Sequence, residues 1–375
     1  MRLYRSRSAT IIGRRALALN GHVGCLKPAP RACEIACVAA IKIIATVPLT
    51  AELREVVQRA VPGAEISDRA CRTNEDVRAL VAGGCDVMLG FRVPDDLLER
   101  APDLKWIQLL SAGADHVSSW IGKNGKVPVT TSSGIHATPI SEYTIASMLA
   151  YAHRLHEMIR AQLRHEWHRR TGFMDTIEEL RGKTLGVIGY GSIGRETARL
   201  ADALGMPVLA LKRNPEDPRD QGWCPAGLGD PEGKIPRKFF GPDQCQAIMA
   251  ESDYLTVTLP LTPATRKFVG AKEIAAMRPG AYIVNIGRGE VIDEQAMIEA
   301  LRGGKIGGAG LDVFEHEPLE ASSPLWDLEN VILTPHMSGA NRGYMEKACE
   351  LFSENLRRFR AGAQLLNVVD PLHGY

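Results

Sequence analysis

The chain has 375 residues, which is enough for two domains that each bury a hydrophobic core. Hydrophobic residues make up 45% and charged residues 24%, a composition typical of a soluble globular protein. The formal net charge is +1, so no global field attracts the chain to nucleic acid or anionic lipid, and we expect neither as a partner. The 8 cysteines are scattered, without a C-x-x-C pair or the spacing of a zinc site, so we expect free thiols and no metal.

The first 38 residues differ from the rest, because they are rich in arginine and Glu34 is their only acidic residue. Such a start is found in organellar transit segments, but an extension with no role in the fold is the simpler interpretation. We expect residues 1–38 to be disordered and the protein to be cytoplasmic, with an organellar location as the alternative. The apolar run at residues 35–48 contains Lys42 and is too short to span a bilayer.

Strands and helices alternate from residue 41 onward. Strands are expected at residues 41–47, 86–90 and 106–110. Thr50 is expected to cap a helix that runs to Val61. This alternation predicts a parallel sheet with helices on both faces. A long helix from residue 143 to about residue 164 would connect this domain to the next, and its apolar face could form a homodimer interface.

The strongest pattern lies between residues 183 and 213. An apolar run at residues 185–188 predicts a buried strand, and the glycines that follow have the spacing G-x-G-x-x-G: Gly189, Gly191 and Gly194. The first glycine permits a tight turn, the second leaves room for a pyrophosphate, and the third lets the next helix pack on the strand. Phosphates would lie on the free N–H groups at the positive end of that helix. We therefore predict a dinucleotide site.

Lys212 and Arg213 follow the next predicted strand, residues 208–211, where a carboxylate would bind the ribose 2′-hydroxyl of NAD. Two cations at this place favour a 2′-phosphate, because a guanidinium can hold a phosphate through two parallel hydrogen bonds. A solvated basic pair at a strand end is the alternative interpretation. We expect NADP(H) to be preferred, with NAD(H) as the second choice.

The second half of the chain places polar groups after strands. Residues 214–244 are rich in proline, glycine and charge, and we expect a long surface insertion without chemistry. Strands then resume at residues 254–259, 281–286, 308–311 and 331–333. Ligands of open α/β sheets bind beyond the carboxyl ends of strands, so the segments 259–265, 284–290, 311–318 and 334–339 are candidate site segments. The small residues at 111–113 follow an earlier strand, and their amides could approach an anion.

These segments form an ordered set of motifs: the glycine turn, Asn-x-x-Arg-Gly at residues 285–289, Asp-Val-Phe-x-x-Glu-Pro at residues 312–318, and Thr-Pro-His at residues 334–336. By this set the chain resembles the D-isomer-specific 2-hydroxyacid dehydrogenase family from about residue 41 onward. The resemblance implies an α/β fold of two doubly wound parallel-sheet domains. A Rossmann dinucleotide-binding domain (residues 143–334) would be inserted in a flavodoxin-like substrate domain (residues 39–142 and 335–375).

The resemblance also implies a catalytic triad of Arg288, Glu317 and His336. Reduction of a 2-keto acid needs a hydride, a proton for the carbonyl oxygen and a cation for the carboxylate. A histidine, with an ordinary pKa near 6.5, suits the proton transfer, and a neighbouring carboxylate would orient the ring and stabilise the imidazolium. A guanidinium would hold the carboxylate and polarise the ketone. Taken singly, each residue has a plain structural interpretation, and only the ordered set favours catalysis.

Further residues are assigned by position in the family pattern. Ala112 and Gly113 would bring backbone amides to the substrate carboxylate, and Asp312 would bind the carboxamide of the cofactor. The remaining cofactor contacts implied are Ser192, Ile193, Leu259, Pro260, Thr265, Ile286 and Gly287. His136 departs from the pattern, since many members have asparagine there, and it is either a second titrating group or a filler. Glu315-His-Glu-Pro318 argues against formate as the substrate.

We therefore expect a reductase of glyoxylate, hydroxypyruvate or a similar 2-keto acid. One alternative is an NAD-linked 3-phosphoglycerate dehydrogenase, for which Arg92 is a candidate phosphate ligand. Such enzymes usually also have a regulatory domain, which we do not expect here. The other is a dinucleotide-sensing binding protein similar to transcriptional corepressors, which would need a peptide-docking cleft.

Overall fold

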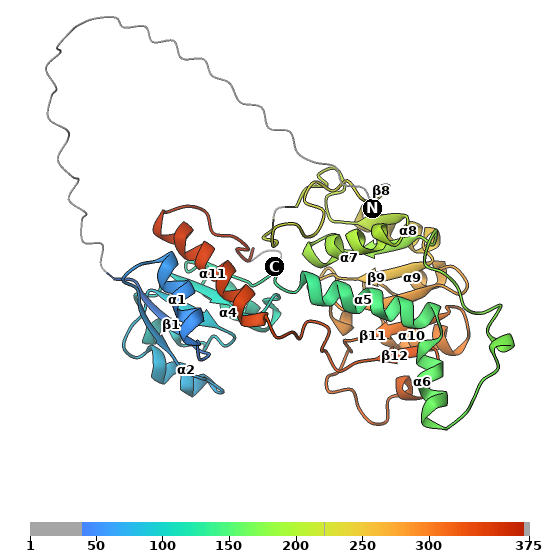
Figure 1. Cartoon of the computed structure of the whole chain (residues 1–375). Helices are drawn as coiled ribbons and strands as arrows, with labels where there is room; N and C mark the ends of the chain where they lie inside the picture. Colours follow the sequence, from blue (N-terminus) through green and yellow to red (C-terminus); the bar gives the residue numbers. More distant parts are fainter. Residues whose placement is uncertain (1–39, 221, 371–375) are drawn as a thin grey trace, which may run out of the picture. The chain divides into compact units, whose positions relative to one another are not determined.

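The computed structural model describes residues 40–220 and 222–370, and Figure 1 shows their helices and strands. The expectations for residues 1–38 lie outside this range. Within it the chain forms two parallel sheets flanked by helices, which confirms the predicted fold class. The domain boundaries at residues 142/143 and 334/335 stay a proposal. No helix among the described residues is both long enough and apolar enough to cross a membrane.

The smaller sheet has the strand order β2-β1-β3-β4-β5. Its strands are β1 (Lys42–Ala45), β2 (Glu65–Asp68), β3 (Val87–Gly90), β4 (Trp106–Leu109) and β5 (Val129–Thr130). The helices of this part are α1 (Ala51–Ala60), α2 (Asn74–Val81), α3 (Leu97–Arg100), α4 (Ser118–Lys123) and α11 (Tyr344–Arg360). The prediction for Thr50 is confirmed, because its side chain accepts a hydrogen bond from the backbone N–H of Leu53 at 3.3 Å and caps α1.

Helix α11, red in Figure 1, packs beside α1, blue, although the two are far apart in the sequence. The fully buried strand β3 alternates its side chains between two apolar layers. Val87 and Leu89 belong to the core that contains α1 and α11, and Met88 belongs to the core on the other face. Each such buried side chain contributes roughly 1.5–3 kcal/mol to the free energy of folding.

The larger sheet has the order β12-β11-β10-β9-β6-β7-β8. Its strands are β6 (Leu185–Ile188), β7 (Val208–Leu211), β8 (Lys238–Phe240), β9 (Tyr254–Val257), β10 (Tyr282–Asn285), β11 (Gly308–Leu311) and β12 (Val331–Leu333). Its helices are α5 (Ala137–Ala152), α7 (Ser192–Ala203), α8 (Cys245–Glu251), α9 (Ala271–Ala276) and α10 (Glu294–Arg302). The chain moves outward from β6 through β7 to β8 and then returns to β9 on the other side of β6. This reversal creates the switch point at which α/β sheets bind ligands.

The predicted helix over residues 143–164 is wrong in two respects. The structure has α5, which begins earlier, and a separate helix α6 (Leu155–Leu163). The break lies at Arg154, whose φ of 55° is left-handed and ends the α-helical path. Helix α5 packs against α7 and β10 of the larger sheet.

The predicted surface insertion at residues 214–244 is only partly a surface segment. It contains β8, which pairs with β7, and Phe240 of β8 is fully buried. Its middle is fixed by Arg195 of α7, a side chain only 1% exposed that donates to the carbonyl oxygen of Asp230 at 2.5 Å. Trp223 packs against the core of the smaller sheet, and its backbone N–H donates to Asn367 Oδ1 at 3.1 Å. Trp223 is therefore held by a contact 144 positions away in the sequence.

Candidate active site

Three predicted catalytic residues follow three adjacent strands of the larger sheet. Arg288 comes after β10, Glu317 after β11 and His336 after β12. Neighbouring strands lie about 4.8 Å apart, so the ends of β10 and β12 are roughly 10 Å apart. Side chains from these loops can reach one small ligand. The parallel topology thus explains how residues far apart in the sequence come to one edge.

His336 and Glu317 form a direct contact. The ring nitrogen Nδ1 lies 2.7 Å from Glu317 Oε2, with the two side chains 49% and 35% exposed. The other carboxylate oxygen of Glu317 accepts the backbone N–H of Phe314 at 3.0 Å, which fixes the carboxylate. With Nδ1 occupied in this way, Nε2 is the ring nitrogen that remains for a ligand.

Asp312 organises the loop that carries His336. It is fully buried, and its Oδ1 accepts the Thr334 hydroxyl at 2.6 Å and the Met337 N–H at 2.8 Å. Its Oδ2 accepts the Ser338 N–H at 2.9 Å, and its backbone carbonyl accepts the His336 N–H at 2.8 Å. These bonds hold His336 at a φ of 50°, a left-handed conformation that a non-glycine residue rarely adopts. The assignment of Asp312 to the carboxamide stays a prediction.

Arg288 contacts the small-residue turn after β4. Its Nη2 lies 3.1 Å from Asp115 Oδ1, and its Nη1 donates to the carbonyl oxygen of Gly287 at 2.9 Å. A Cβ on Gly113 would lie 2.6 Å from Arg288 Nη2, so a side chain there would displace the guanidinium from its present position. Gly113 and the neighbouring Ala112 are both partly exposed. The predicted carboxylate-binding residues of the two sheets are therefore brought together.

The glycine turn has the geometry expected of a dinucleotide site. Gly189 has a φ of 105°, which favours glycine, and a Cβ on Gly194 would clash with the carbonyl oxygen of Gly189. Nothing lies within 4 Å of a Cβ built on Gly191, where a pyrophosphate would need the space. Gly191 is the N-cap of α7 and no side chain caps this end, so the first N–H groups, beginning with Ser192 and Ile193, are left for a ligand.

The two cations after β7 differ in their surroundings. Lys212 is partly buried, and its Nζ donates to the backbone carbonyl of Asp217 and, at 3.3 Å, to that of Arg219. Burial, and then the nearby Arg195, lowers the pKa of the Lys212 amine. Arg213 is exposed. The Lys212 amine is thus engaged by the insertion, and the assignment of the two cations to a 2′-phosphate stays a prediction.

The other predicted cofactor residues shape two adjoining turns. Thr265 donates its hydroxyl to the carbonyl oxygen of Pro260 at 2.6 Å, and a Cβ on Gly287 would lie 2.6 Å from the carbonyl oxygen of Leu259. Ile286 is 5% exposed and belongs to the core. These contacts place both turns side by side at the switch point.

His136 lies at the start of α5, and its ring is edge-on to Tyr344, with the centroids 5.2 Å apart. Burial, followed by the charges of Lys347 and Arg288, lowers its pKa to about 4. This lowered pKa favours a neutral His136 ring at neutral pH, and the role of His136 stays a prediction.

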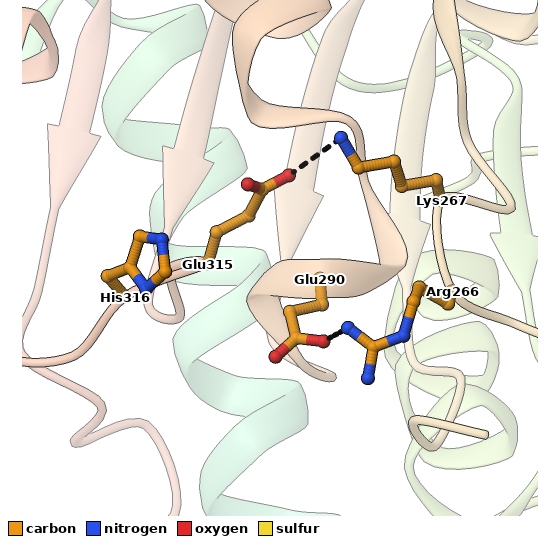
Figure 2. A pocket seen from close by; sticks show the side chains of 5 residues that line it. All are labelled: Arg266, Lys267, Glu290, Glu315 and His316. Carbon is orange, nitrogen blue, oxygen red and sulfur yellow. Dashed lines mark ion pairs between the residues drawn. The ribbon is translucent and has the colours of Figure 1, made fainter. Parts of the chain in front are cut away.

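A separate small pocket of about 160 Å³ lies beside the motif at residues 312–318 (Figure 2). Its charges pair with one another, because Arg266 contacts Glu290 and Lys267 Nζ lies 3.6 Å from Glu315 Oε1. None of the predicted site residues lines it. Among the described residues no cluster of histidine, cysteine and carboxylate side chains could hold a metal ion.

Sequence reasoning missed two functional candidates, Asp115 and Tyr143. Asp115 is the ion-pair partner of Arg288, and Tyr143 OH lies 2.7 Å from Thr334 Oγ1. An acidic residue directly after the small-residue turn was a usable signal for Asp115. No local pattern pointed to Tyr143, because its partner is 191 residues away.

Comparisons with known proteins show what this chain is similar to. Residues 145–338 match the model of the family described as D-isomer specific 2-hydroxyacid dehydrogenase, NAD binding domain. A glyoxylate reductase from Aeropyrum pernix is 34% identical over 299 residues, which cover 78% of this chain and 84% of that protein. A D-3-phosphoglycerate dehydrogenase from Methanocaldococcus jannaschii is 32% identical, with coverages of 88% and 59%.

Two solved structures are similar over most of the chain. A D-isomer specific 2-hydroxyacid dehydrogenase from Xanthobacter autotrophicus, in complex with NADPH and MES, has a TM-score of 0.71 and 30% identity, covering 90% of this chain and 100% of that one. An NADPH-dependent glyoxylate/hydroxypyruvate reductase from Sinorhizobium meliloti, in complex with NADP and sulfate, has a TM-score of 0.71 and 27% identity, with coverages of 89% and 100%.

Proposed function

Because this chain belongs to the D-isomer specific 2-hydroxyacid dehydrogenase family, we propose that it reduces glyoxylate, hydroxypyruvate or a similar small 2-keto acid with NADPH. The family makes it an oxidoreductase with a nicotinamide dinucleotide cofactor. The observation that carries the proposal is the 2.7 Å contact of His336 with Glu317 on the sheet edge that also carries Arg288. The names of the relatives from Aeropyrum and Sinorhizobium support this substrate class.

The proposed mechanism uses His336 as the proton donor. Nδ1–H donates to the Glu317 carboxylate, which stabilises the imidazolium and directs Nε2–H at the ketone oxygen. A nicotinamide dinucleotide bound at the glycine turn would supply the hydride for the carbonyl carbon. The C=O bond thereby becomes an alcohol, with one new C–H bond and one new O–H bond, and His336 is left neutral. In the reverse direction the neutral ring accepts the hydroxyl proton.

Arg288 would hold the substrate carboxylate and polarise the ketone. In the structure its guanidinium is paired with Asp115, with the side chains 32% and 38% exposed. Ion pairs at such exposure contribute only about 0–1 kcal/mol, so a substrate carboxylate can replace this partner. Backbone amides of Ala112 and Gly113 would complete the carboxylate site.

The preference for NADPH over NADH rests on Arg213 at the end of β7, with Lys212 holding the adjacent loop. A guanidinium gains charge-assisted hydrogen bonds from a 2′-phosphate and none of equal strength from a hydroxyl. NAD(H) remains the alternative cofactor.

A substrate panel tests the proposal. Oxidation of NADPH and NADH is followed with glyoxylate, hydroxypyruvate and 3-phosphohydroxypyruvate as acceptors. We expect turnover of the first two with a lower KM for NADPH. The rival is an NAD-linked 3-phosphoglycerate dehydrogenase, favoured by the relative from Methanocaldococcus. A higher kcat/KM for the phosphorylated acid with NADH would establish that rival instead.

We also propose a homodimer that buries helix α6. Leu155, Ile159 and Leu163 recur every four residues on its surface, with exposures of 49%, 57% and 78%. Trp167, which follows, is 95% exposed. Apolar side chains gathered on one helix face are typical of a subunit interface. Ile159→Glu is expected to convert a dimer to a monomer in analytical ultracentrifugation, whereas a monomeric wild type would contradict the assignment.

A further inference from the structure

Three aromatic rings form a continuous row next to the proposed active site. Phe91 follows β3, Tyr344 begins α11 and His136 precedes α5. The rings of Phe91 and Tyr344 are stacked with centroids 6.4 Å apart, and those of Tyr344 and His136 meet edge-on at 5.2 Å. The Tyr344 hydroxyl donates to the carbonyl oxygen of Leu110 at 2.6 Å, so the polar end of this residue is already engaged.

One end of the row adjoins the partner of Arg288. His116 Nε2 lies 2.9 Å from the carbonyl oxygen of Phe91, and His116 is the residue after Asp115, which pairs with Arg288. A chain of contacts thus leads from the Arg288–Asp115 ion pair through His116 to the backbone of Phe91.

The other end adjoins the loop that carries His336. A Cβ built on Gly339 would lie 2.9 Å from Cδ2 of His136, and Gly339 is three residues after His336. The field of Arg288 also acts on the His136 ring. The aromatic row therefore extends from near the Arg288 ion pair to the loop that carries His336.

The row carries no charge of its own. The Nδ1 atom of His136 is buried without a hydrogen-bond partner, and its pKa of about 4 keeps the ring neutral near pH 7. Arg92, the neighbour of Phe91, is exposed, and Lys347, one turn after Tyr344 on α11, is partly buried. These two cations are the groups that would favour a phosphorylated substrate.

We propose that Phe91, Tyr344 and His136 form the wall that contacts the substituent on the keto carbon and that they select uncharged substituents over phosphorylated ones. A phosphate against this wall would lose hydration, and the three rings offer no cation to pair with it. An ethyl or hydroxymethyl group would instead bury carbon against aromatic faces. The inference rests on the proposed function, since it concerns the same site. Glyoxylate has only hydrogen at this position and serves as the internal reference.

The test compares kcat/KM for glyoxylate, 2-ketobutyrate, hydroxypyruvate and 3-phosphohydroxypyruvate. In Phe91→Ala, kcat/KM for 2-ketobutyrate divided by kcat/KM for glyoxylate is expected to fall about tenfold. This is the lower end of the range for the loss of an apolar contact in a pocket. Phe173→Ala is the matched control, because it removes the same ring from a loop after α6 and should leave the ratio unchanged. Phe91→Arg, at a side chain 39% exposed, is expected to raise the ratio of 3-phosphohydroxypyruvate to hydroxypyruvate about tenfold.

Thermal melts and NADPH binding confirm that each variant is folded. If the wild type and Phe91→Ala have the same ratio of kcat/KM for 2-ketobutyrate to kcat/KM for glyoxylate, the proposed wall is contradicted. A wild type that prefers 3-phosphohydroxypyruvate, through Arg92 and Lys347, would also contradict it. Failure of the wild type to reduce glyoxylate or any other acid would instead overturn the proposed function, so the two failures are distinguishable.

Discussion

Arg288 and Asp115 form an ion pair that joins the two sheets, with Nη2 3.1 Å from Oδ1, although they are 173 positions apart in the sequence. Asp115 thus holds the guanidinium to which we assign the substrate carboxylate. A negative charge at this place both competes with the substrate and repels it.

Asp115→Asn should therefore bind the keto acid more tightly. An exposed ion pair contributes up to about 1 kcal/mol, so KM for glyoxylate is expected to fall by as much as about fivefold with kcat little changed. Steady-state kinetics at constant ionic strength give this value. Asp243→Asn, an equal change of charge at an exposed position, is the control. A raised KM in Asp115→Asn would mean that the carboxylate positions Arg288 instead.

The carboxylate of Asp312 accepts three hydrogen bonds in the loop that carries His336. Asp312→Asn would turn one acceptor oxygen into a donor that faces another donor, at a cost of about 1–3 kcal/mol. We expect a lower melting temperature and a lower kcat. Thr334→Val removes a single donor and should have a smaller effect in the same direction. Unchanged kcat and stability in Asp312→Asn would contradict its role in positioning the loop.

Arg213 should discriminate between the two cofactors. Arg213→Ala removes charge-assisted hydrogen bonds worth about 1.5–3 kcal/mol, so KM for NADPH is expected to rise by about ten- to a hundredfold while KM for NADH stays nearly constant. Lys212→Ala should mainly lower thermal stability, because the Lys212 amine binds backbone carbonyls of the insertion. Equal losses with both cofactors in Arg213→Ala would remove the 2′-phosphate assignment.

His136 should make the folded chain less stable as the pH is lowered. Burial and the charges of Lys347 and Arg288 lower its pKa to about 4 in the folded chain. Between that value and the ordinary value of about 6.5, the unfolded chain binds a proton that the folded chain does not, so stability decreases as pH falls through this window.

Urea unfolding at pH 7 and pH 5 measures this contribution. His136→Asn should lose less stability than the wild type over that interval, by at most about 2 kcal/mol. His153→Asn, at an exposed histidine, is the control and should behave as the wild type. Identical pH dependence in the wild type and His136→Asn would show that folding does not lower the pKa of His136.

The elements predicted well from the sequence are those with local signals. Strands β6, β7, β11 and β12 have the predicted bounds, because short apolar runs between turn residues mark buried strands. The glycine turn was equally clear. Strand β2 was missed, since Glu65–Asp68 is polar and lies at the sheet edge with little buried surface.

Features that depend on distant contacts were not predictable in this way. The break at Arg154 has no proline or glycine to mark it, and the ordering of residues 214–244 depends on the buried Arg195 side chain. The catalytic candidates were found through an ordered set of motifs, whereas the pairing of Arg288 with Asp115 joins segments 173 residues apart. Local sequence patterns carry no information on such a pair.

The central claim is that His336, oriented by Glu317, transfers the proton to the ketone. The most direct measurement is the single-turnover rate of NADPH oxidation by His336→Gln with glyoxylate, after cofactor binding has been verified by fluorescence titration. The control is His316→Gln, which changes the histidine directly before Glu317; His316 lines the pocket in Figure 2. We predict a loss of about 10²- to 10⁴-fold for His336→Gln and none for His316→Gln. A His336→Gln enzyme that binds NADPH and reduces glyoxylate at the wild-type rate would contradict the claim.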